Sequence, residues 1–358
     1  MDLSPLLKIP PFSLNIKDKE KFLTSFLNQL SKFHYDNCAY YTKMIDSSNY
    51  DLNKIEHFSK LPFLPVRLFK LFDLKSVKKE NIIKTMTSSG TSGQAVSKIY
   101  LDKVTSSNQT KVLAKIVASF TGNKRTPMLI IDSESVVKDR KLFTARGAGI
   151  LGFSMFGTNR MYALNEKMEL KINSINEFLK ENKGKRIFIF GFTYIIYKHF
   201  YKELVRLNIK LDLSNSVMIH GGGWKKLINE SVDSKTFRKN LKTVSGIQSV
   251  HDYYGMVEQT GSIFMECKMG YLHASIFSDI IIRRPHDFSV ANIGEAGIIQ
   301  LLSILPSSYP GHSLLTEDEG VLLGEDDCSC GKLGKYFKII GRLKNAEIRG
   351  CSDTYEEN

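Results

Sequence analysis

Four short segments of the sequence combine glycine, hydroxyl, aromatic and carboxylate residues in ways that suit the binding of a nucleotide. The first is TSSGTSGQ at residues 87–94, where two glycines accompany five hydroxyl side chains. The backbone N–H groups of such a loop can surround a phosphate, and the hydroxyls can complete the contact. The segment lacks the Gly-Lys-Ser/Thr ending of the usual P-loop. A serine-rich surface turn has the same composition, so the pattern alone favours neither interpretation.

The second segment, HGGGWKK at residues 220–226, directly follows the strand-like run VMI. Three glycines at the end of a strand allow the backbone to approach a flat ligand. The only tryptophan, Trp224, could form a wall of that site or cap the core. Lys225 and Lys226 could reach phosphates, although two lysines that open a helix more often face solvent.

The third segment, YYGMVEQTG at residues 253–261, places an aromatic ring, a glycine and a carboxylate in close order. Tyr254 could stack on a base, and Gly255 could turn the chain. Glu258 could then bind Mg²⁺, because this ion prefers carboxylate and phosphate oxygens. Alone, the pattern is too common to assign a function.

The fourth segment, LLTEDEG at residues 314–320, predicts an acidic turn between two strands. Asp318 in this turn could accept hydrogen bonds from ribose hydroxyls. An ordinary polar hairpin is the alternative interpretation.

A cysteine lies unusually close to the end of the sequence. The run GRLKNAEIRG at residues 341–350 predicts a turn around a short strand, and Cys351 follows it in a polar tail. Free cysteine is more often a buried hydrophobic residue. This position therefore suggests a thiol with a chemical role.

Three further cysteines and a histidine form two closely spaced pairs. Cys267 and His273 lie six residues apart in ECKMGYLH, and Cys328 and Cys330 form the run CSCG. Four such ligands suffice for tetrahedral Zn²⁺ with a structural role. The spacing is not that of a standard zinc finger, so core cysteines with a hydrogen-bonded histidine are the alternative.

Strand-like apolar runs alternate with amphipathic stretches, which predicts an α/β protein with a largely parallel sheet. Late strands with short connections predict a smaller β-rich subdomain near the end of the sequence. Helices are expected at 17–34, where Phe22, Phe26, Leu27 and Leu30 share a face, and at 104–120, 172–182, 194–207 and 225–241. Strands are expected at 127–132, 187–191, 217–220, 279–284, 297–304, 320–323 and 337–341.

The expected domains are an N-terminal helical segment packed on the main domain, an α/β nucleotide- and acyl-binding core, the β-rich subdomain, and a hinge with a tail. Their ranges are 1–80, 81–264, 265–340 and 341–358.

Composition excludes several classes of protein. The longest nearly apolar run, residues 187–197, is too short for a membrane span of about 20 residues. The N-terminus does not have the pattern of a secretory signal, and five cysteines in 358 residues suit a reducing cytoplasm. The net charge of +13 comes without a zinc finger, RNP motif or basic helical stripe, so no nucleic-acid partner is expected. The charge could instead serve polyphosphate substrates or an acidic partner protein.

In this order, the four segments resemble those of the adenylate-forming enzymes, which join a carboxylate to AMP. The resemblance implies that the hydroxyl-rich loop holds the ATP phosphates and that the glycine-rich strand end lines the adenine pocket. It also implies that Tyr254 packs the adenine, that Glu258 supplies the Mg²⁺ ligand and that Asp318 takes the ribose. GRLKNAEIRG matches the hinge motif of these enzymes. The implied nucleotide-binding residues are Ser88, Ser89, Gly90, Thr91, Ser92, Gly93, Gly221, Gly222, Gly223, Tyr254, Gly255, Asp318 and the hinge arginine, Arg342.

Several segments narrow the resemblance to the LuxE acyl-protein synthetase family, a branch close to the phenylacetate-CoA ligases. They are LPFLPVRLFK, TSSGTSG, GGGWKK and SSYPGHSLLTEDEGVLL. The similarity runs from about residue 35 to the C-terminus. This family activates a fatty acyl group as acyl-AMP and moves it to a cysteine near its own C-terminus. A partner reductase then collects the acyl group, as in the fatty acid reductase complex of bacterial bioluminescence.

The resemblance assigns a role to Cys351. A full adenylate-forming ligase continues about a hundred residues past the hinge into a small lid domain, whereas this sequence ends eight residues after Gly350. We therefore expect no lid domain and no lid lysine, and we expect Cys351 to attack the acyl-AMP as a thiolate. Lys225 or Lys226 would then steady the α-phosphate. An incidental tail cysteine is the alternative.

The resemblance also supports the metal site, because many relatives of the phenylacetate-CoA ligases have Glu-Cys…Gly-x-His and Cys-x-Cys-Gly at matching places. Some of them bind zinc there. The sequence as a whole predicts a cytoplasmic ligase that uses ATP and Mg²⁺ on a carboxylic acid, with a fatty acid as the expected substrate, and that serves an acyl reductase or acyl-carrier partner. Transfer to coenzyme A or to a carrier-protein thiol is the nearest alternative. A non-catalytic module that binds nucleotides or nucleic acid is the alternative from another class.

Overall fold

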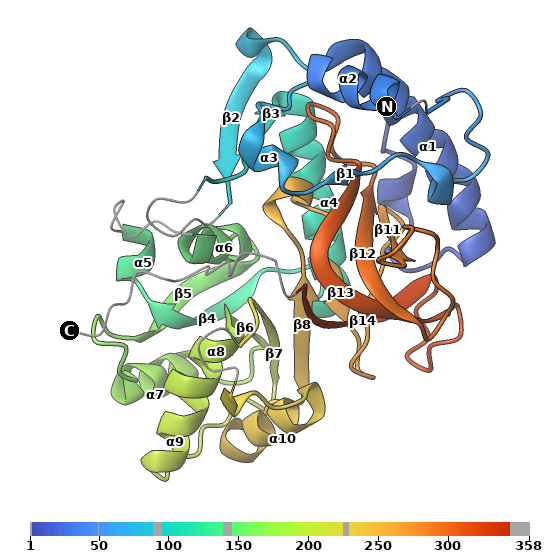
Figure 1. The fold of residues 1–358 in the computed structure, drawn as a ribbon. Helices are drawn as coiled ribbons and strands as arrows, with labels where there is room; N and C mark the ends of the chain where they lie inside the picture. Colours follow the sequence, from blue (N-terminus) through green and yellow to red (C-terminus); the bar gives the residue numbers. More distant parts are fainter. Residues whose placement is uncertain (1, 49, 89–94, 139–144, 225–228, 344–358) are drawn as a thin grey trace. The chain divides into compact units, whose positions relative to one another are not determined.

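The computed structural model describes residues 2–48, 50–88, 95–138, 145–224 and 229–343 (Figure 1). Its contacts divide the chain into two compact units. The first unit combines residues 1–119 with the segment that starts at Gly255, and the second unit runs from Phe120 to Tyr254. The N-terminal helices and the late strands thus belong to one unit, and the expected domain boundaries stay a prediction.

The second unit is built on a parallel sheet, whose strand order among the described residues is β5-β4-β6-β7-β8. Both β6 and β7 are buried along their whole length. The strands expected at 127–132, 187–191 and 217–220 are confirmed. They could be recognised because strands covered by helices on both faces have continuous apolar sequences. The bounds are β4 (Thr126–Ser133), β5 (Gly157–Leu164), β6 (Ile187–Phe192), β7 (Ser216–Gly221) and β8 (Ser249–Tyr254).

Helices lie on both sides of this sheet. In Figure 1, α6 (Ala145–Ser154) lies on one side, and α7 (Ile172–Glu181), α9 (Lys202–Arg206) and α10 (Ser234–Ser245) lie on the other. The other helical segments are α5 (Ser135–Lys138), α8 (Thr193–Ile195) and the π-helical segment η4 (Ile196–Tyr201). The helices expected at 172–182 and 194–207 are confirmed.

The expected start of the helix at residue 225 is wrong. The helix α10 begins at Ser234, and the side chain of Asp233 accepts the Thr236 N–H at 2.6 Å as its N-cap. A capping aspartate fixes the first turn of a helix because it satisfies a backbone donor that has no partner inside the helix. The lysines at 225 and 226 lie outside the described residues.

The first unit is built on an antiparallel sheet with the order β11-β12-β13-β14-β10-β9 among the described residues. A short parallel pairing of β1 (Leu64–Pro65) on β13 extends it. The bounds are β9 (Phe264–Glu266), β10 (Leu272–His273), β11 (Ser278–Arg283), β12 (Ala296–Ser303), β13 (Ser313–Glu325) and β14 (Lys335–Arg342). These bounds confirm the strands expected at 279–284, 297–304 and 337–341.

The acidic turn expected at residues 314–320 is wrong, because β13 runs through this segment without a turn. The strand expected at 320–323 is its second half. The acidic residues fit a strand because they are only partly buried and face arginines on neighbouring segments. The ladder with β14 shifts its register between Glu319 and Gly320, which accommodates the dense packing around this glycine.

Helices and a hairpin complete the first unit. Among the described residues, every helix of the chain is too short or too polar to traverse a lipid bilayer. The hairpin pairs β2 (Ile82–Thr87) with β3 (Lys98–Asp102) in antiparallel fashion. The helical segments are η1 (Leu6–Lys8), α1 (Ile16–Asn37), α2 (Ala39–Ser47), η2 (Phe58–Lys60), α3 (Leu68–Leu71), η3 (Lys79–Asn81), α4 (Lys103–Thr121) and η6 (Val257–Gln259).

The expected helix at 17–34 is confirmed as α1, although its most buried stripe differs from the expected one. Leu27 and Leu30 are fully buried as expected. Phe22 and Phe26 are only partly buried, and their rings pack edge to face with centroids 6.0 Å apart. The buried stripe also contains Lys19, which a hydrophobic pattern cannot reveal.

Lys19 is buried because it forms an ion pair inside the first unit. Its Nζ lies 3.3 Å from Asp279 Oδ2 on β11, and Lys335 Nζ lies 3.7 Å from the other oxygen of Asp279. The pair is almost inaccessible to solvent. Burial lowers the pKa of Lys19, against the attraction of the Asp279 carboxylate, which raises it. The N-terminal helix is therefore attached to the sheet by charge as well as by apolar packing.

We expect Lys19→Met to lower the free energy of unfolding by about 3 to 5 kcal/mol, because it removes one partner of a buried charge pair. The exposed Lys17 on the same helix provides the matched control. Urea unfolding followed by far-UV circular dichroism measures both variants. Equal unfolding midpoints for Lys19→Met and Lys17→Met would contradict the assignment.

Candidate functional site

Two predicted site residues meet on adjacent strands of the first unit. Asp318 on β13 is the ladder partner of Arg342 on β14. The Arg342 Nε lies 3.3 Å from Asp318 Oδ1, and the Asp318 side chain keeps 18% of its surface exposed. The carboxylate can therefore contact a ligand while the guanidinium holds it in place.

A neighbouring carboxylate, Glu317, was not among the predicted site residues. It lies 3.2 Å from Arg342 and 3.2 Å from Arg67, which precedes α3. Glu317, within β13, thus joins the segment after β1 to the end of β14. The acidic run LLTEDEG was the signal for it, but the sequence did not show which carboxylate faces the arginines.

Glu258 lies in the short turn η6 and is almost completely buried. Its backbone carbonyl accepts a hydrogen bond from the Tyr309 hydroxyl at 2.9 Å. Gly255, just before the turn, packs closely, since a Cβ there would lie 3.0 Å from Ile263 Cγ2. The turn therefore holds a carboxylate in a fixed position, which is the kind of ligand that Mg²⁺ prefers.

The hydroxyl-rich loop starts from the hairpin of β2 and β3. The Ser88 N–H donates to the Ser97 carbonyl at 3.1 Å, and Ser88 Oγ accepts the Ser97 N–H at 2.9 Å. Ser88 thus closes the base of the loop. Residues 89–93, Lys225 and Cys351 lie outside the described residues, so their roles stay predictions.

The glycine-rich segment lies where β7 ends beside the end of β8, in the second unit. Gly221 is the ladder partner of Tyr253, and a Cβ on Gly221 would lie 2.6 Å from that ring. Gly222 and Gly223 have φ angles of +87° and +64°, the left-handed region that favours glycine. A Cβ on Gly222 would lie 2.7 Å from the Phe192 ring. The rings of Tyr253 and Phe192 therefore pack directly against the backbone of Gly221 and Gly222.

Tyr254 is the last residue of β8 and is partly buried. Because β8 pairs in parallel with β7, Tyr254 lies at the same edge of the sheet as Gly221. This edge is where open α/β sheets usually bind ligands, because the carboxyl ends of parallel strands converge there. The structure thus brings the two predicted adenine-binding segments together within the second unit.

Thr193 is a residue at this edge that the sequence analysis missed. It begins α8 directly after β6, and its Oγ1 donates to the Gly221 carbonyl at 3.1 Å. The same oxygen lies 2.9 Å from His220 Nδ1. A hydroxyl residue immediately after a fully buried strand was the available signal.

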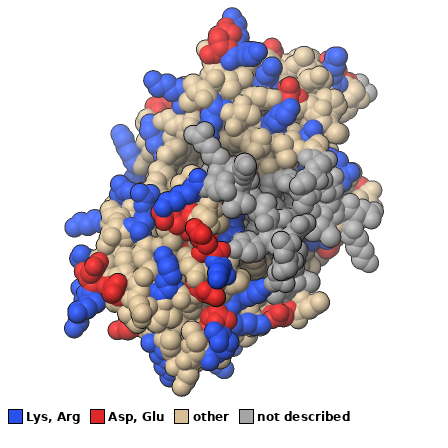
Figure 2. All heavy atoms as spheres, turned by 90° about the vertical axis from the view of Figure 1, so that its left-hand side faces the viewer, with Lys and Arg blue, Asp and Glu red and all other residues tan. Residues whose placement is uncertain are grey.

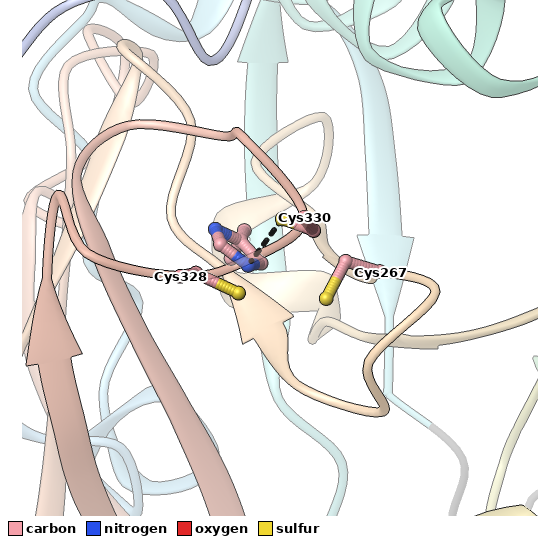
Figure 3. Close-up of side chains that lie close together, drawn as sticks. Cys267, Cys328 and Cys330 are labelled. Atoms are coloured by element: carbon pink, nitrogen blue, oxygen red, sulfur yellow. Dashed lines mark hydrogen bonds between the residues drawn. The ribbon is translucent and has the colours of Figure 1, made fainter.

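The four predicted metal ligands converge in the first unit. The ligand atoms of Cys267, His273, Cys328 and Cys330 all lie within 4.8 Å of one another. Figure 3 shows the three cysteines around one point, with a dashed line for the 3.4 Å contact between Cys330 Sγ and His273 Nε2. Two segments far apart in the sequence thus supply two ligands each.

Backbone N–H groups point at two of these sulfurs. The Met269 N–H donates to Cys267 Sγ and the Lys332 N–H donates to Cys330 Sγ, each at 3.4 Å. Burial raises the pKa of the Cys328 thiol to about 12 and lowers the pKa of His273 to about 4. The histidine is therefore neutral at physiological pH and can act as a metal ligand.

Charge is mixed on the molecular face shown in Figure 2. Lysine and arginine side chains are dispersed there among aspartates and glutamates over the visible part that the structure describes.

Comparisons with known proteins agree on a class. A family model described as "Acyl-protein synthetase, LuxE" matches residues 3–358. A long-chain-fatty-acid–luciferin-component ligase of Vibrio harveyi is 22% identical over 356 residues, which cover 96% of this chain and 89% of the relative. The protein of the same name from Aliivibrio fischeri is also 22% identical, with coverages of 96% and 90%.

Solved structures support the fold. A crystal structure of 2-hydroxyisobutyryl-CoA ligase with 2-HIB-AMP and CoA, in an open conformation, has a TM-score of 0.71. It is 14% identical, and the match covers 94% of this chain and 78% of that one. A postadenylation complex of the same ligase has a TM-score of 0.69 at 12% identity, with coverages of 92% and 69%. The predicted fold class, that of the adenylate-forming ligases, is therefore confirmed.

We expect Gly221→Ala to lower the stability of the second unit by roughly 1 to 3 kcal/mol, since the added methyl group must displace the Tyr253 ring. Trp224, the only tryptophan, packs in this unit 5.9 Å from Phe237, so its fluorescence reports the unfolding. Gly152→Ala is the control, because a Cβ there meets nothing within 4 Å. Alanine in that helix should stabilise by roughly 0.5 to 1 kcal/mol. A free energy of unfolding for Gly221→Ala that is no lower than that of the wild type would contradict the packing described.

Proposed function

The chain belongs to the LuxE acyl-protein synthetase family and is a ligase, and we propose that it activates a long-chain fatty acid with ATP and Mg²⁺. The product would be an acyl-AMP, from which the acyl group passes to the thiol of Cys351. Family membership supports the reaction class, and the names of the curated relatives support the fatty acid.

The ion pair between Asp318 and Arg342 is the observation that best supports nucleotide binding. These residues come from two separate motifs, and they lie 3.3 Å apart on neighbouring strands. A carboxylate oriented by a guanidinium is a suitable acceptor for the two hydroxyls of a ribose. The glycines at the end of β7 suit the adenine, because a Cβ on Gly223 would meet nothing within 4 Å and the backbone there is open to a flat ligand. Within each unit, the residues present fit the nucleotide.

The donor set also fits Mg²⁺, which proteins usually bind through one or two carboxylates together with substrate phosphates. Glu258 would supply the carboxylate. The ion would neutralise charge on the phosphates during adenylation. The residues 88–93 would hold those phosphates, and Lys225 would steady the α-phosphate.

The proposed reaction has two steps. A carboxylate oxygen of the fatty acid attacks the α-phosphorus of ATP, the bond to the β-phosphate breaks, and pyrophosphate leaves. The Cys351 thiolate then attacks the acyl carbon, the bond to AMP breaks, and a thioester forms while AMP leaves. A thiol on the same chain needs no encounter with a diffusing acceptor.

An acyl reductase or a carrier protein would then collect the acyl group from Cys351. The names of the relatives point to a luciferin component, which supports a fatty acid reductase complex as the destination. ATP and a free thiol are both available in the reducing cytoplasm, where we expect the protein to act.

Radiolabelled fatty acid with ATP should label the chain through a bond that hydroxylamine cleaves. Cys351→Ser should lose this label and keep fatty-acid-dependent ATP–pyrophosphate exchange at the wild-type rate, because only the second step needs the thiol. Cys38→Ser, which removes a buried cysteine elsewhere, should keep both activities.

Persistent thioester labelling of Cys351→Ser would overturn self-acylation, and exchange without labelling of the wild type would favour coenzyme A or a carrier-protein thiol. If no member of a panel of fatty and aryl acids supports exchange, the protein is a binding module instead.

We further propose that Cys267, His273, Cys328 and Cys330 hold one structural Zn²⁺. An ion with nitrogen at about 2.0 Å and sulfur at about 2.3 Å in tetrahedral geometry separates those atoms by about 3.5 Å. The observed distance from His273 Nε2 to Cys330 Sγ is 3.4 Å. Burial raises the pKa of the Cys267 thiol, and the Met269 N–H that donates to its sulfur opposes that rise, in the direction of the thiolate that zinc requires.

Protein purified without chelator should contain one zinc per chain by mass spectrometry of the metal. Cys328→Ser should lose most of this zinc and unfold at a lower temperature, because a structural zinc contributes directly to folding. Cys38→Ser should keep the metal. Zinc content that is unchanged in Cys328→Ser, or absent from the wild type, would contradict the site.

A further inference from the structure

The loop at residues 306–312, PSSYPGH, is buried in the first unit although loops usually lie at the surface. Its backbone and side chains are held by elements that are distant in the sequence. His34 on α1 contacts the Pro306 carbonyl at 3.1 Å, and the Ser76 N–H donates to the Ser308 carbonyl at 2.8 Å. These contacts leave the loop with a single defined conformation.

The loop and the turn that carries Glu258 exchange hydrogen bonds in both directions. The Tyr309 hydroxyl donates to the Glu258 carbonyl at 2.9 Å. In return, Gln259 Nε2 donates to the Gly311 carbonyl at 2.8 Å and to the Leu301 carbonyl at 3.2 Å. All of these groups are buried, so each bond replaces a contact with water that the fold has removed.

The Tyr309 hydroxyl must donate to the Glu258 carbonyl, because a carbonyl oxygen can only accept, and its other partner leaves that proton free. Gln109 Nε2 on α4 donates to the Tyr309 hydroxyl at 3.2 Å. The oxygen thus accepts from an amide, and its own proton is available for the Glu258 carbonyl. Complete burial raises the pKa of Tyr309 far above its usual value, so the hydroxyl keeps this proton.

Two glycines let these segments approach each other. A Cβ on Gly311 would lie 2.8 Å from the Glu258 carbonyl oxygen and 2.3 Å from the Tyr309 ring. Gly261 has a φ of +90°, and a Cβ there would lie 2.6 Å from the Gln109 carbonyl oxygen. Backbone therefore packs on backbone on both sides of the Tyr309 hydroxyl, and the turn has little room to move.

We propose that Tyr309 is a positioning residue for the metal ligand: its hydroxyl fixes the Glu258 carbonyl and so sets where the Glu258 carboxylate lies. This inference rests on the proposed function, which gives Glu258 the Mg²⁺. A purely structural tyrosine would stabilise the first unit without affecting how the protein responds to Mg²⁺. Removal of the Tyr309 hydroxyl oxygen therefore distinguishes the two roles, because only a positioning role predicts a changed Mg²⁺ response.

Tyr309→Phe removes that oxygen and keeps the ring. Without ligands, hydrogen exchange measured by mass spectrometry should show faster exchange in the peptide that covers residues 255–262, because the turn has lost its hydrogen bond to Tyr309. In the pyrophosphate exchange assay, the Mg²⁺ concentration for half-maximal rate should rise roughly 10- to 100-fold, as for other residues that orient a metal ligand.

Tyr41→Phe is the matched control. Tyr41 is equally buried in the same core cluster, and its hydroxyl makes no hydrogen bond to the turn that carries Glu258. Tyr41→Phe should leave both the exchange of residues 255–262 and the Mg²⁺ response as in the wild type. If Tyr309→Phe behaves like Tyr41→Phe in both measurements, the inference is wrong.

A double variant separates action through Glu258 from an independent effect. If Tyr309 acts through Glu258, adding Tyr309→Phe to Glu258→Gln causes no further loss of rate. Losses that multiply would show an independent role and would overturn the inference.

Two failures can be told apart. If Glu258→Gln keeps the wild-type Mg²⁺ dependence, Glu258 is not the metal ligand, and the inference about Tyr309 fails with that assignment. In the other case, Glu258→Gln is defective, but Tyr309→Phe keeps the wild-type Mg²⁺ response and the wild-type hydrogen exchange. This result would overturn only the role of Tyr309.

Discussion

The hydrogen bond from Tyr309 to the Glu258 carbonyl is the buried contact that constrains the turn around Glu258. It joins a turn at residue 258 to a loop that is held by the N-terminal helix, by α4 and by the late strands. None of these segments could define the turn alone, because the contacts span hundreds of residues. The N-terminal helix α1 therefore helps to hold the loop that contacts the Glu258 turn, although it carries none of the predicted nucleotide-binding residues. Burial makes the contact specific, since an unpaired donor or acceptor there would be costly.

Much of the second unit could be predicted from sequence because its chemistry follows its strands. Buried parallel strands have apolar sequences, and the glycines after β7 mark the edge of the sheet where the nucleotide is expected. The strands β5 and β8 were missed, since GTNRMYAL and SVHDYY carry polar residues that pattern alone assigns to loops. The clustering of Cys267, His273, Cys328 and Cys330 could be predicted because cysteine and histidine at short spacing are rare and chemically specific.

The remaining features depend on distant partners, which a single sequence does not reveal. Lys19 looks like one of many surface lysines until Asp279 is placed beside it. Asp318 was assigned to a turn because acidic residues usually interrupt strands, whereas Arg342 on the next strand allows β13 to continue. Tyr309 lies in a Pro- and Gly-rich segment that indicates an exposed loop. The two partners of its hydroxyl, Gln109 and the Glu258 carbonyl, come from distant parts of the chain.

The central claim is that the chain activates a carboxylic acid by adenylation, and an isotope transfer tests it most directly. Fatty acid labelled with ¹⁸O in both carboxylate oxygens is incubated with the protein, ATP and Mg²⁺, and the nucleotide products are analysed by mass spectrometry. Attack of the carboxylate on the α-phosphorus predicts AMP that carries one ¹⁸O atom, because one oxygen leaves with the nucleotide when the thioester forms. Unlabelled AMP, or label in orthophosphate or pyrophosphate, would contradict the account.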